Sequence, residues 1–230
     1  ISTPHRQLVI ESRARVHTRS KVSYDRLPYG FSHQDLGRCR RVEDCHPFLQ
    51  DSTYVSLTPE AWRLALDIQA GSTDVFQTAY AIMEHVYRNF SYIAGSTTVS
   101  THASEVLRQG SGVCQDFAHA MVALCRSLGI PARYVSGYLF DSTRDHSMRG
   151  AEASHAWVEV YIEPAGWIGL DPTNNKVVDE TYIVLATGRD YRDVAPVVGS
   201  YYGGSGSTLE VAVRVERMDR AGLPVNDPGA

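Results

Sequence analysis

The sequence lacks the features that mark membrane proteins, nucleic-acid-binding proteins and metalloproteins. It has no run of about 20 apolar residues, which argues against a transmembrane helix. Its 22 basic and 26 acidic residues give a net charge of −4, so no basic excess favours nucleic acid or an anionic membrane surface. No Cys-x-x-Cys pair or His/Cys cluster indicates zinc, and no acidic loop has the spacing of calcium ligands. We therefore expect no metal or cofactor, and neither nucleic acid nor a membrane as partner.

Outside residues 110–116, the glycines and cysteines of the sequence give little information about function. Gly203, Gly204 and Gly206 form no phosphate-binding loop, because no strand-to-helix context or lysine accompanies them. Of the four cysteines, Cys39 and Cys45 could form a disulfide, but free thiols are the default in a cytosolic protein. A cytoplasmic location is expected because no signal peptide is recognisable, although the chain begins Ile-Ser-Thr-Pro without a methionine.

The most informative segment is Gly-Ser-Gly-Val-Cys-Gln-Asp, residues 110–116, which opens a long apolar helix with a cysteine in its first turn. A helix N-terminus carries unpaired N–H groups and about half a positive charge, and both favour a thiolate at Cys114. Gly129 ends the predicted helix, and Pro131 prevents its continuation. The apolar stripe of this helix comprises Cys114, Phe117, Ala118, Met121, Val122, Leu124, Cys125 and Leu128.

Two alternatives to a reactive thiolate apply to the cysteines of this helix. Most free cysteines pack as small hydrophobic residues, and this alternative stays open for Cys114 and is favoured for Cys125. A redox pair of the two thiols is not favoured, because they lie about 16 Å apart along one helix, which is beyond disulfide reach.

A histidine and an aspartate at strand ends supply the partners that a catalytic cysteine needs. Residues 154–162 alternate apolar and other side chains, which predicts a strand that starts near His155. A turn follows at 163–166, and residues 167–171 predict a second strand that ends at Asp171 before a proline. A cysteine nucleophile, a histidine base and an orienting carboxylate are the parts of a Cys-His-Asp triad.

The register of these two strands decides whether the carboxylate can reach the histidine. A plain four-residue loop at 163–166 would place Asp171 on the apolar face, away from His155. We therefore predict a loop of odd length or a bulge within 161–169, with Gly166 as the favoured position because glycine tolerates a positive φ. The histidine and the aspartate should then lie on neighbouring strands within hydrogen-bond distance.

Four stretches of the sequence carry a specific resemblance. They are Gly-Ser-Gly-Val-Cys-Gln-Asp-Phe-Ala-His (110–119), Leu-Gly-Ile-Pro-Ala-Arg-Tyr-Val-Ser-Gly-Tyr (128–138), Ser-His-Ala-Trp-Val-Glu-Val (154–160) and Gly-Trp-Ile-Gly-Leu-Asp-Pro-Thr (166–173). In this order they resemble the transglutaminase-like superfamily of papain-type cysteine enzymes, in particular its bacterial branch. The resemblance covers about residues 60–200 and implies an α+β, papain-like core with the nucleophile helix packed on an antiparallel sheet. It implies Cys114 as nucleophile, His155 as base and Asp171 as the residue that orients the base.

Acyl transfer also needs hydrogen-bond donors for the oxyanion and a cleft for the substrate. The backbone N–H of Cys114 is one candidate donor. The resemblance implies an aromatic side chain upstream of the nucleophile as the second donor, and Tyr92 is the candidate for this role. Packing of Tyr92 on the core is the competing interpretation. Trp157, close to His155 on the same strand, is predicted to line the substrate cleft.

The remaining histidines are interpreted as structural or exposed. His119 lies about 140° around the helix from Cys114, so it cannot reach the thiol and is expected to be a partly buried structural residue. His102 and His146 lie in polar, loop-like stretches. The polar segment 141–150, which leads into the His155 strand, either borders the cleft or is solvent-exposed, and exposure is favoured.

The chain is expected to comprise an N-terminal part (1–55), a catalytic core (56–200) and a C-terminal part (201–230). The N-terminal part is interpreted as the remainder of a β-rich region that bacterial relatives carry upstream. Residues 7–18 are predicted to form a strand that pairs with a terminal strand over 209–215. Further predicted elements are helices over 59–71, 73–90 and 104–109, and strands over 132–140 and 182–186.

The predicted activity is cysteine-dependent acyl transfer on an amide or peptide bond, through a thioester at Cys114. The partner is a peptide or protein substrate that carries an amide; the sequence gives no indication of the oligomeric state. Hydrolysis is favoured over cross-linking, because a transglutaminase must exclude water and no feature of the sequence indicates this. The alternatives are a true protein-glutamine transglutaminase and a catalytically silent binding module of the same fold.

Overall fold

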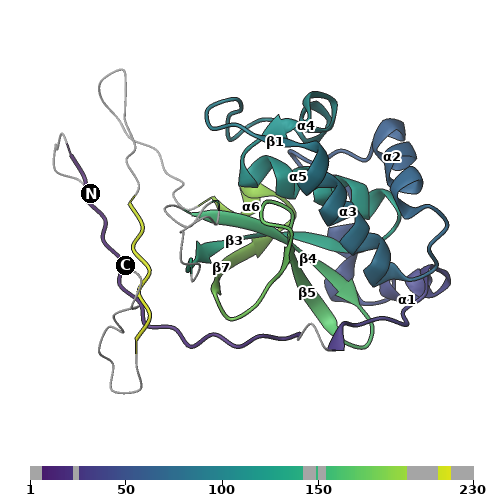
Figure 1. The fold of residues 1–230 in the computed structure, drawn as a ribbon, viewed down its shortest axis with the longest axis horizontal. Helices are drawn as coiled ribbons and strands as arrows, with labels where there is room; N and C mark the ends of the chain where they lie inside the picture. The colour runs from purple at the N-terminus through teal and green to yellow at the C-terminus, as the bar shows by residue number, and fades with distance from the viewer. Residues whose placement is uncertain (1–6, 23–25, 142–148, 150–153, 196–211, 219–230) are drawn as a thin grey trace.

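A computed structural model of the 230-residue chain shows an antiparallel sheet with helices packed on one side of it (Figure 1). The structure describes residues 7–22, 26–141, 149, 154–195 and 212–218. The α+β fold class predicted from the sequence is confirmed. In this part of the chain no helix has the length and apolar character needed to cross a membrane.

The described helices are α1 (Leu36–Cys39), α2 (Pro59–Gln69), α3 (Val75–Asn89), α4 (Ala103–Gln109), α5 (Cys114–Ser127) and α6 (Tyr191–Val194), with 3₁₀ turns at His33–Asp35 and Glu43–Leu49. The strands are β1 (Ser91–Tyr92), β2 (Ser111–Gly112), β3 (Ala132–Leu139), β4 (His155–Ile162), β5 (Gly166–Asp171), β6 (Lys176–Val177) and β7 (Tyr182–Gly188). The helices and strands predicted within the core therefore all form, with ends that differ by a few residues.

The main sheet has the strand order β6-β5-β4-β3-β7, and all its pairings are antiparallel. Between β4 and β5 the last pair is Ile162 with Gly166, which leaves a three-residue loop. Gly166 has a φ of 80°, a conformation that glycine adopts without strain. The predicted odd loop is confirmed. Because Val158 pairs with Leu170, the residues before and after them point to the opposite face, which carries His155 and Asp171.

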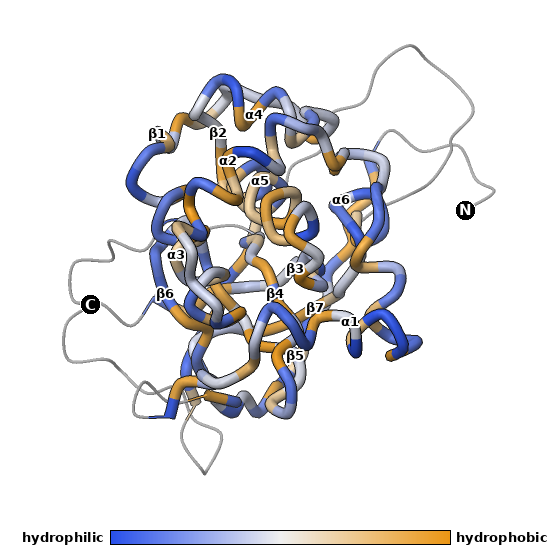
Figure 2. The backbone as a smooth tube through the Cα atoms, turned by 90° about the vertical axis from the view of Figure 1, so that its right-hand side faces the viewer, coloured by the Kyte–Doolittle hydropathy of each residue, from blue (hydrophilic) through white to orange (hydrophobic). Residues whose placement is uncertain are grey.

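Helix α5 is the centre of the hydrophobic core. It packs against α2, α3 and α4 on one side and against β3 and β4 on the other. Nearly every residue from its first turn to its last is buried, as expected for a helix that other elements surround. Figure 2 shows hydrophobic residues concentrated along this helix and the central strands, and hydrophilic residues in the outer segments. Such a helix gives its first residue, Cys114, a fixed position.

The predicted N-terminal strand over 7–18 is wrong. Residues 7–20 form no helix or strand, and almost all of them are exposed. The apolar alternation there is limited to Leu8 and Ile10, and no described strand pairs with the segment to satisfy its backbone. Of the predicted partner strand over 209–215, residues 209–211 lie outside the described residues, and residues 212–217 are not in a strand.

Candidate active site

The nucleophile candidate, Cys114, is the first residue of α5 and is partly exposed. The turn before it is fixed by Asp116, whose Oδ2 accepts hydrogen bonds from the Val113 N–H at 2.8 Å and the Thr97 hydroxyl at 2.5 Å. Gly112 makes this possible, because a Cβ there would lie 2.6 Å from the same carboxylate oxygen. The backbone N–H groups of the first turn have no partner within the helix, so they are available to a ligand beside the sulfur.

The strands bring together the two other residues predicted for the triad. His155 is the first residue of β4 and Asp171 the last residue of β5, and their side chains are completely buried. The Nε2 atom of His155 lies 2.8 Å from Oδ2 of Asp171, so the predicted hydrogen bond is confirmed. Its cause is the three-residue loop described above, which puts both side chains on one face of the sheet.

Asp171 is held by a set of donors that the sequence analysis missed. Its Oδ2 also accepts hydrogen bonds from the Asn174 Nδ2 atom and the Tyr182 hydroxyl, each at 2.8 Å. Its Oδ1 accepts the N–H of Thr173 at 2.8 Å. The sequence Asp-Pro-Thr-Asn contained a signal for part of this, because an aspartate side chain often accepts the N–H two residues further on. The contact with Tyr182 comes from another strand and leaves no local sequence signal.

The electrostatics of this pair favour an imidazolium beside a carboxylate. Burial disfavours charge on the His155 ring, but the charge of Asp171, with the hydrogen bonds of the ring to Asp171 and Cys114, outweighs burial and raises the pKa of His155 to about 10. Burial likewise opposes charge on Asp171, but His155, Asn174 and Tyr182 hold the pKa of that carboxyl below its usual value. At neutral pH the two residues are therefore an ion pair.

The second nitrogen of His155 faces the nucleophile. Its Nδ1 atom is buried and has no nitrogen or oxygen partner among the residues that the structure describes. Besides Asp171, the side chain that acts on the ring is Cys114, which raises the pKa of His155 by hydrogen bonding and, as a thiolate, by its charge. No standard hydrogen bond joins Nδ1 to a residue that the structure describes, and catalytic hydrogen bonds often tighten only when a substrate binds.

Tyr92 lies close to the nucleophile, as its predicted role requires. Strand β1 pairs with β2 so that Tyr92 is opposite Gly112, two residues before Cys114. The ring packs edge-on against Phe117 with 6.1 Å between ring centroids, so the core-packing interpretation also holds in part. Burial and then the charge of Cys114 raise the pKa of Tyr92, which places its hydroxyl within electrostatic range of the sulfur. The oxyanion role itself stays a prediction.

Trp157 does not line a substrate cleft in this structure. Its side chain is fully buried in a small cluster on the sheet face that also carries His155. The indole lies edge-on to Tyr182 at 5.3 Å and near His155 at 6.1 Å between ring centroids. Trp157 therefore packs against the rings of His155 and Tyr182. The sequence placed it on the correct face, but alternation alone does not show whether a face is covered.

The remaining histidines and cysteines are placed as follows. His119 is completely buried, more than expected, and its Nε2 accepts the N–H of Tyr191 at 3.1 Å. His102 is exposed at the start of α4, and His146 lies outside the described residues. All four cysteines are free thiols. Complete burial raises the pKa of Cys125 to about 12, which confirms its interpretation as a hydrophobic residue.

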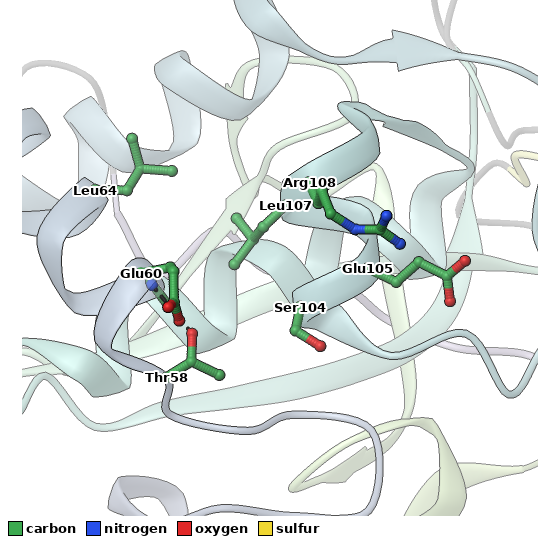
Figure 3. Close-up of a pocket in the computed structure, with 8 residues that line it drawn as sticks. Thr58, Glu60, Leu64, Ser104, Glu105, Leu107 and Arg108 are labelled. Carbon is green, nitrogen blue, oxygen red and sulfur yellow. Dashed lines mark hydrogen bonds between the residues drawn. The ribbon is translucent and has the colours of Figure 1, made fainter.

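A pocket on the described residues lies away from this site. It has a volume of about 540 Å³ and lies between α2 and α4 (Figure 3). Its walls are partly apolar and partly charged, and none of Cys114, His155 or Asp171 lines it. The residues that line it are Thr58, Glu60, Ala61, Leu64, Ser104, Glu105, Leu107 and Arg108. No group of three or more His, Cys, Asp or Glu side chains in the described part of the chain could hold a metal ion.

Comparisons with known proteins show to which family this chain belongs. The family model described as the transglutaminase-like superfamily matches residues 63–172. An uncharacterised protein of Mycobacterium leprae is 33% identical over 222 residues, which cover 95% of this chain and 76% of that protein. An uncharacterised protein of Mycobacterium tuberculosis is 45% identical over 141 residues, or 58% of this chain and 45% of that protein. The chain belongs to the transglutaminase-like superfamily.

A solved structure supports the fold assignment. A proposed cysteine protease from Cytophaga hutchinsonii superposes with a TM-score of 0.58 at 37% sequence identity, over 66% of this chain and 50% of that chain. The chain thus spans about three quarters of the M. leprae relative but half or less of the M. tuberculosis relative and of the C. hutchinsonii protein. The residues matched by the family model, 63–172, include Cys114, His155 and Asp171.

Proposed function

We propose that the protein is a cysteine-dependent acyl-transfer enzyme that acts on amide or peptide bonds with Cys114, His155 and Asp171 as its triad. The observation that carries this proposal is the buried imidazole of His155. One of its nitrogens is 2.8 Å from the Asp171 carboxylate, and the other has no nitrogen or oxygen partner and lies beside the Cys114 thiol. A free buried ring nitrogen alone does not carry the proposal, because Nδ1 of the structural His119 also has no hydrogen-bond partner. What supports it is the combination at His155 of a carboxylate on one nitrogen with the influence of Cys114 on the same ring.

The proposed reaction starts from a thiolate at Cys114 and an imidazolium at His155. The sulfur attacks the amide carbonyl, and the carbonyl oxygen becomes an oxyanion, for which the Cys114 backbone N–H and the Tyr92 hydroxyl are the proposed donors; the position of Tyr92 opposite Gly112 supports its role. His155 then gives its proton to the leaving nitrogen, the carbon–nitrogen bond breaks, and a thioester remains on Cys114. Asp171 keeps the ring oriented and its charged form stable throughout.

Water is the second substrate that we favour. Neutral His155 takes a proton from a water molecule, the resulting hydroxide attacks the thioester, and the carboxylic acid and the thiol are released. A transglutaminase would use an amine at this step and would need to keep water out. Cys114 is partly exposed, which supports the hydrolytic reaction.

Product analysis tests this proposal. The full chain is incubated with glutamine-containing peptides, with and without a primary amine, and the products are identified by mass spectrometry. Cleaved peptide, free ammonia and amine-linked peptide each identify a different reaction, and the Cys114→Ala variant controls for contaminating activity. If no product depends on Cys114 across a broad peptide panel, the chain is a binding module rather than an enzyme.

A further inference from the structure

Arg149 is attached to the frame of the candidate active site by its backbone. Its N–H donates to Oδ1 of Asn174 at 3.0 Å, and its carbonyl oxygen accepts a hydrogen bond from Nδ2 of the same residue at 3.1 Å. The Nδ2 atom of Asn174 also donates to the Asp171 carboxylate at 2.8 Å. One asparagine therefore joins the backbone of Arg149 to the carboxylate that orients His155.

The guanidinium of Arg149 extends toward the nucleophile side of the site. Its central carbon lies 5.2 Å from the centroid of the Tyr92 ring, a cation–π distance. The charges of Cys114 and Arg149 both act on the pKa of the Tyr92 hydroxyl, the first raising it and the second lowering it. Tyr92 therefore interacts with both Arg149 and Cys114, and Asn174 contacts both Arg149 and Asp171.

The charge of Arg149 is exposed and not neutralised by a described carboxylate. Among the residues that the structure describes, no acidic side chain forms an ion pair with it, whereas the nearby Lys176 is paired with Asp179 at 2.8 Å. Asp171 is completely buried and forms its ion pair with His155. A planar guanidinium whose charge no described carboxylate neutralises is suited to bind a carboxylate through two parallel hydrogen bonds.

We propose that Arg149 is a substrate-binding residue that recognises a carboxylate close to the scissile amide, so that the enzyme prefers acyl donors with an acidic group at that position. This inference rests on the proposed function, because it assigns specificity to the same site. The carboxylate can be an acidic side chain or the free C-terminus of a peptide, and both present the same chemistry to the guanidinium.

Charge selectivity at Cys114 tests the inference without a known substrate. Iodoacetate and iodoacetamide both alkylate a thiolate with loss of iodide, and they differ mainly in charge. Because Cys39, Cys45 and Cys125 are buried, labelling of the folded protein reports on Cys114. In Arg149→Gln the ratio of the iodoacetate rate to the iodoacetamide rate should fall roughly threefold at low ionic strength, and the difference should shrink in high salt.

The substitution Arg149→Gln is a clean test, because the hydrogen bonds to Asn174 come from the backbone and remain available. Arg63→Gln is the matched control, since it removes an equally exposed arginine from α2, away from Cys114. An unchanged ratio in Arg149→Gln, or an equal fall in both variants, overturns the proposal. A role of Arg149 only in packing on Tyr92 would change stability without changing this ratio.

Peptide substrates distinguish the two sources of the carboxylate. The panel compares a glutamate with a glutamine beside the scissile amide, and a free with an amidated C-terminus. The native enzyme should prefer one acidic member by about tenfold in kcat/KM, through KM, and Arg149→Gln should remove the preference. Arg149→Lys should restore it in part. If Arg149→Gln lowered kcat/KM equally on acidic and neutral peptides, the proposal would be overturned. If no peptide were turned over but the alkylation ratio still depended on Arg149, the result would count only against the proposed function.

Discussion

His155 and His119 are both almost completely buried, and the protein changes their pKa values in opposite directions. Around His155, the charge of Asp171 outweighs the effect of burial, and the pKa rises to about 10. Around His119, the effect of burial is larger than that of the Asp190 charge. The charge of Arg126 lowers the pKa further, and the pKa falls to about 4. Both rings have an aspartate in range, but only His155 has a carboxylate in direct hydrogen-bond contact.

The hydrogen-bond partners explain the difference. The Nε2 atom of His119 accepts a backbone N–H from Tyr191, which requires a neutral nitrogen, and its ring packs between Tyr54 and Tyr134. The Nε2 atom of His155 faces an ionised carboxylate, which favours the protonated ring. Burial therefore identifies neither histidine as functional. The partner of Nε2 and the influence of Cys114 on the His155 ring separate the proton-transfer candidate from the packing residue.

The largest expected effect is the loss of the nucleophile. Cys114→Ala should lower turnover by about 10⁴-fold or more, because no other described group near His155 can form the thioester. Its thermal stability should change little, since the side chain is partly exposed. The control is Cys125→Ala on the same helix, which should keep its activity but lose about 1 kcal/mol of unfolding free energy through a small cavity. Comparable turnover in both variants would remove Cys114 from the mechanism.

Replacing the aspartate beside each histidine by asparagine tests the comparison directly. Asp171→Asn should lower kcat/KM by about 10³-fold, because the ring loses both its orientation and the charge that stabilises its protonated form.

Asp190→Asn is the matched variant at the other histidine. Asp190 is also buried, and it caps α6 and accepts the N–H of Tyr54 at 2.8 Å. This change should lower the thermal midpoint but leave kcat/KM within about threefold of the native value. Steady-state kinetics and thermal melts of the two variants measure the contrast. A kinetic effect of Asp190→Asn as large as that of Asp171→Asn would refute the assignment.

The pH dependence of stability should separate the histidines in acid. The pKa of His119 is 6.5 in the reference state and about 4 in the folded protein, so between these values the unfolded chain binds a proton that the native chain does not. The stability that neutral His119 contributes is present above pH 6.5, and roughly 2–3 kcal/mol of it is lost as the pH falls to 4. Urea unfolding at several pH values measures this slope.

His119→Gln should flatten that slope, since a glutamine oxygen can still accept the Tyr191 N–H. His155→Gln should not, because the pKa of His155 is raised to about 10 and the ring is protonated in both states below pH 6.5. The contribution of His155 is instead complete below pH 6.5 and is lost as the pH rises toward 10. An acid slope that depends on His155 and not on His119 would contradict the comparison.

The smallest predicted effect concerns the hydroxyl that supports Asp171. Tyr182→Phe removes one of the three groups that bond to Oδ2 of Asp171 and should lower kcat/KM by about threefold to tenfold. Tyr161→Phe, at the far end of β4 from His155, is the control and should have no kinetic effect. Equal kinetics in the two variants would show that the remaining donors hold Asp171 by themselves.

Several parts of the site could be predicted from the sequence because they depend on local patterns. The apolar stripe and the glycine before it located α5 and put Cys114 at its first position. The alternation in residues 154–162 placed His155 on one face of its strand, and the need for Asp171 on the same face required an odd loop, which the structure confirms. Periodicity and loop parity are properties of a few consecutive residues.

The errors came from segments where local pattern is not sufficient. No strand in the described part of the chain pairs with the predicted strand at 7–18, and pairing is a tertiary property. Trp157 was placed on the correct face, but only the packing of Val135, Leu139 and Tyr182 shows that this face is covered there.

By itself, the sequence determined the family, the order of Cys114, His155 and Asp171, and the elements that carry them. Only the tertiary structure determined which groups surround those side chains. Tyr182 reaches Asp171 from another strand, and Asn174 links Asp171 to the backbone of Arg149. Tyr191 reaches His119 across 72 residues of sequence. Secondary structure follows from repeats of two or 3.6 residues, whereas the charge of a buried imidazole depends on contacts between atoms that are distant in sequence.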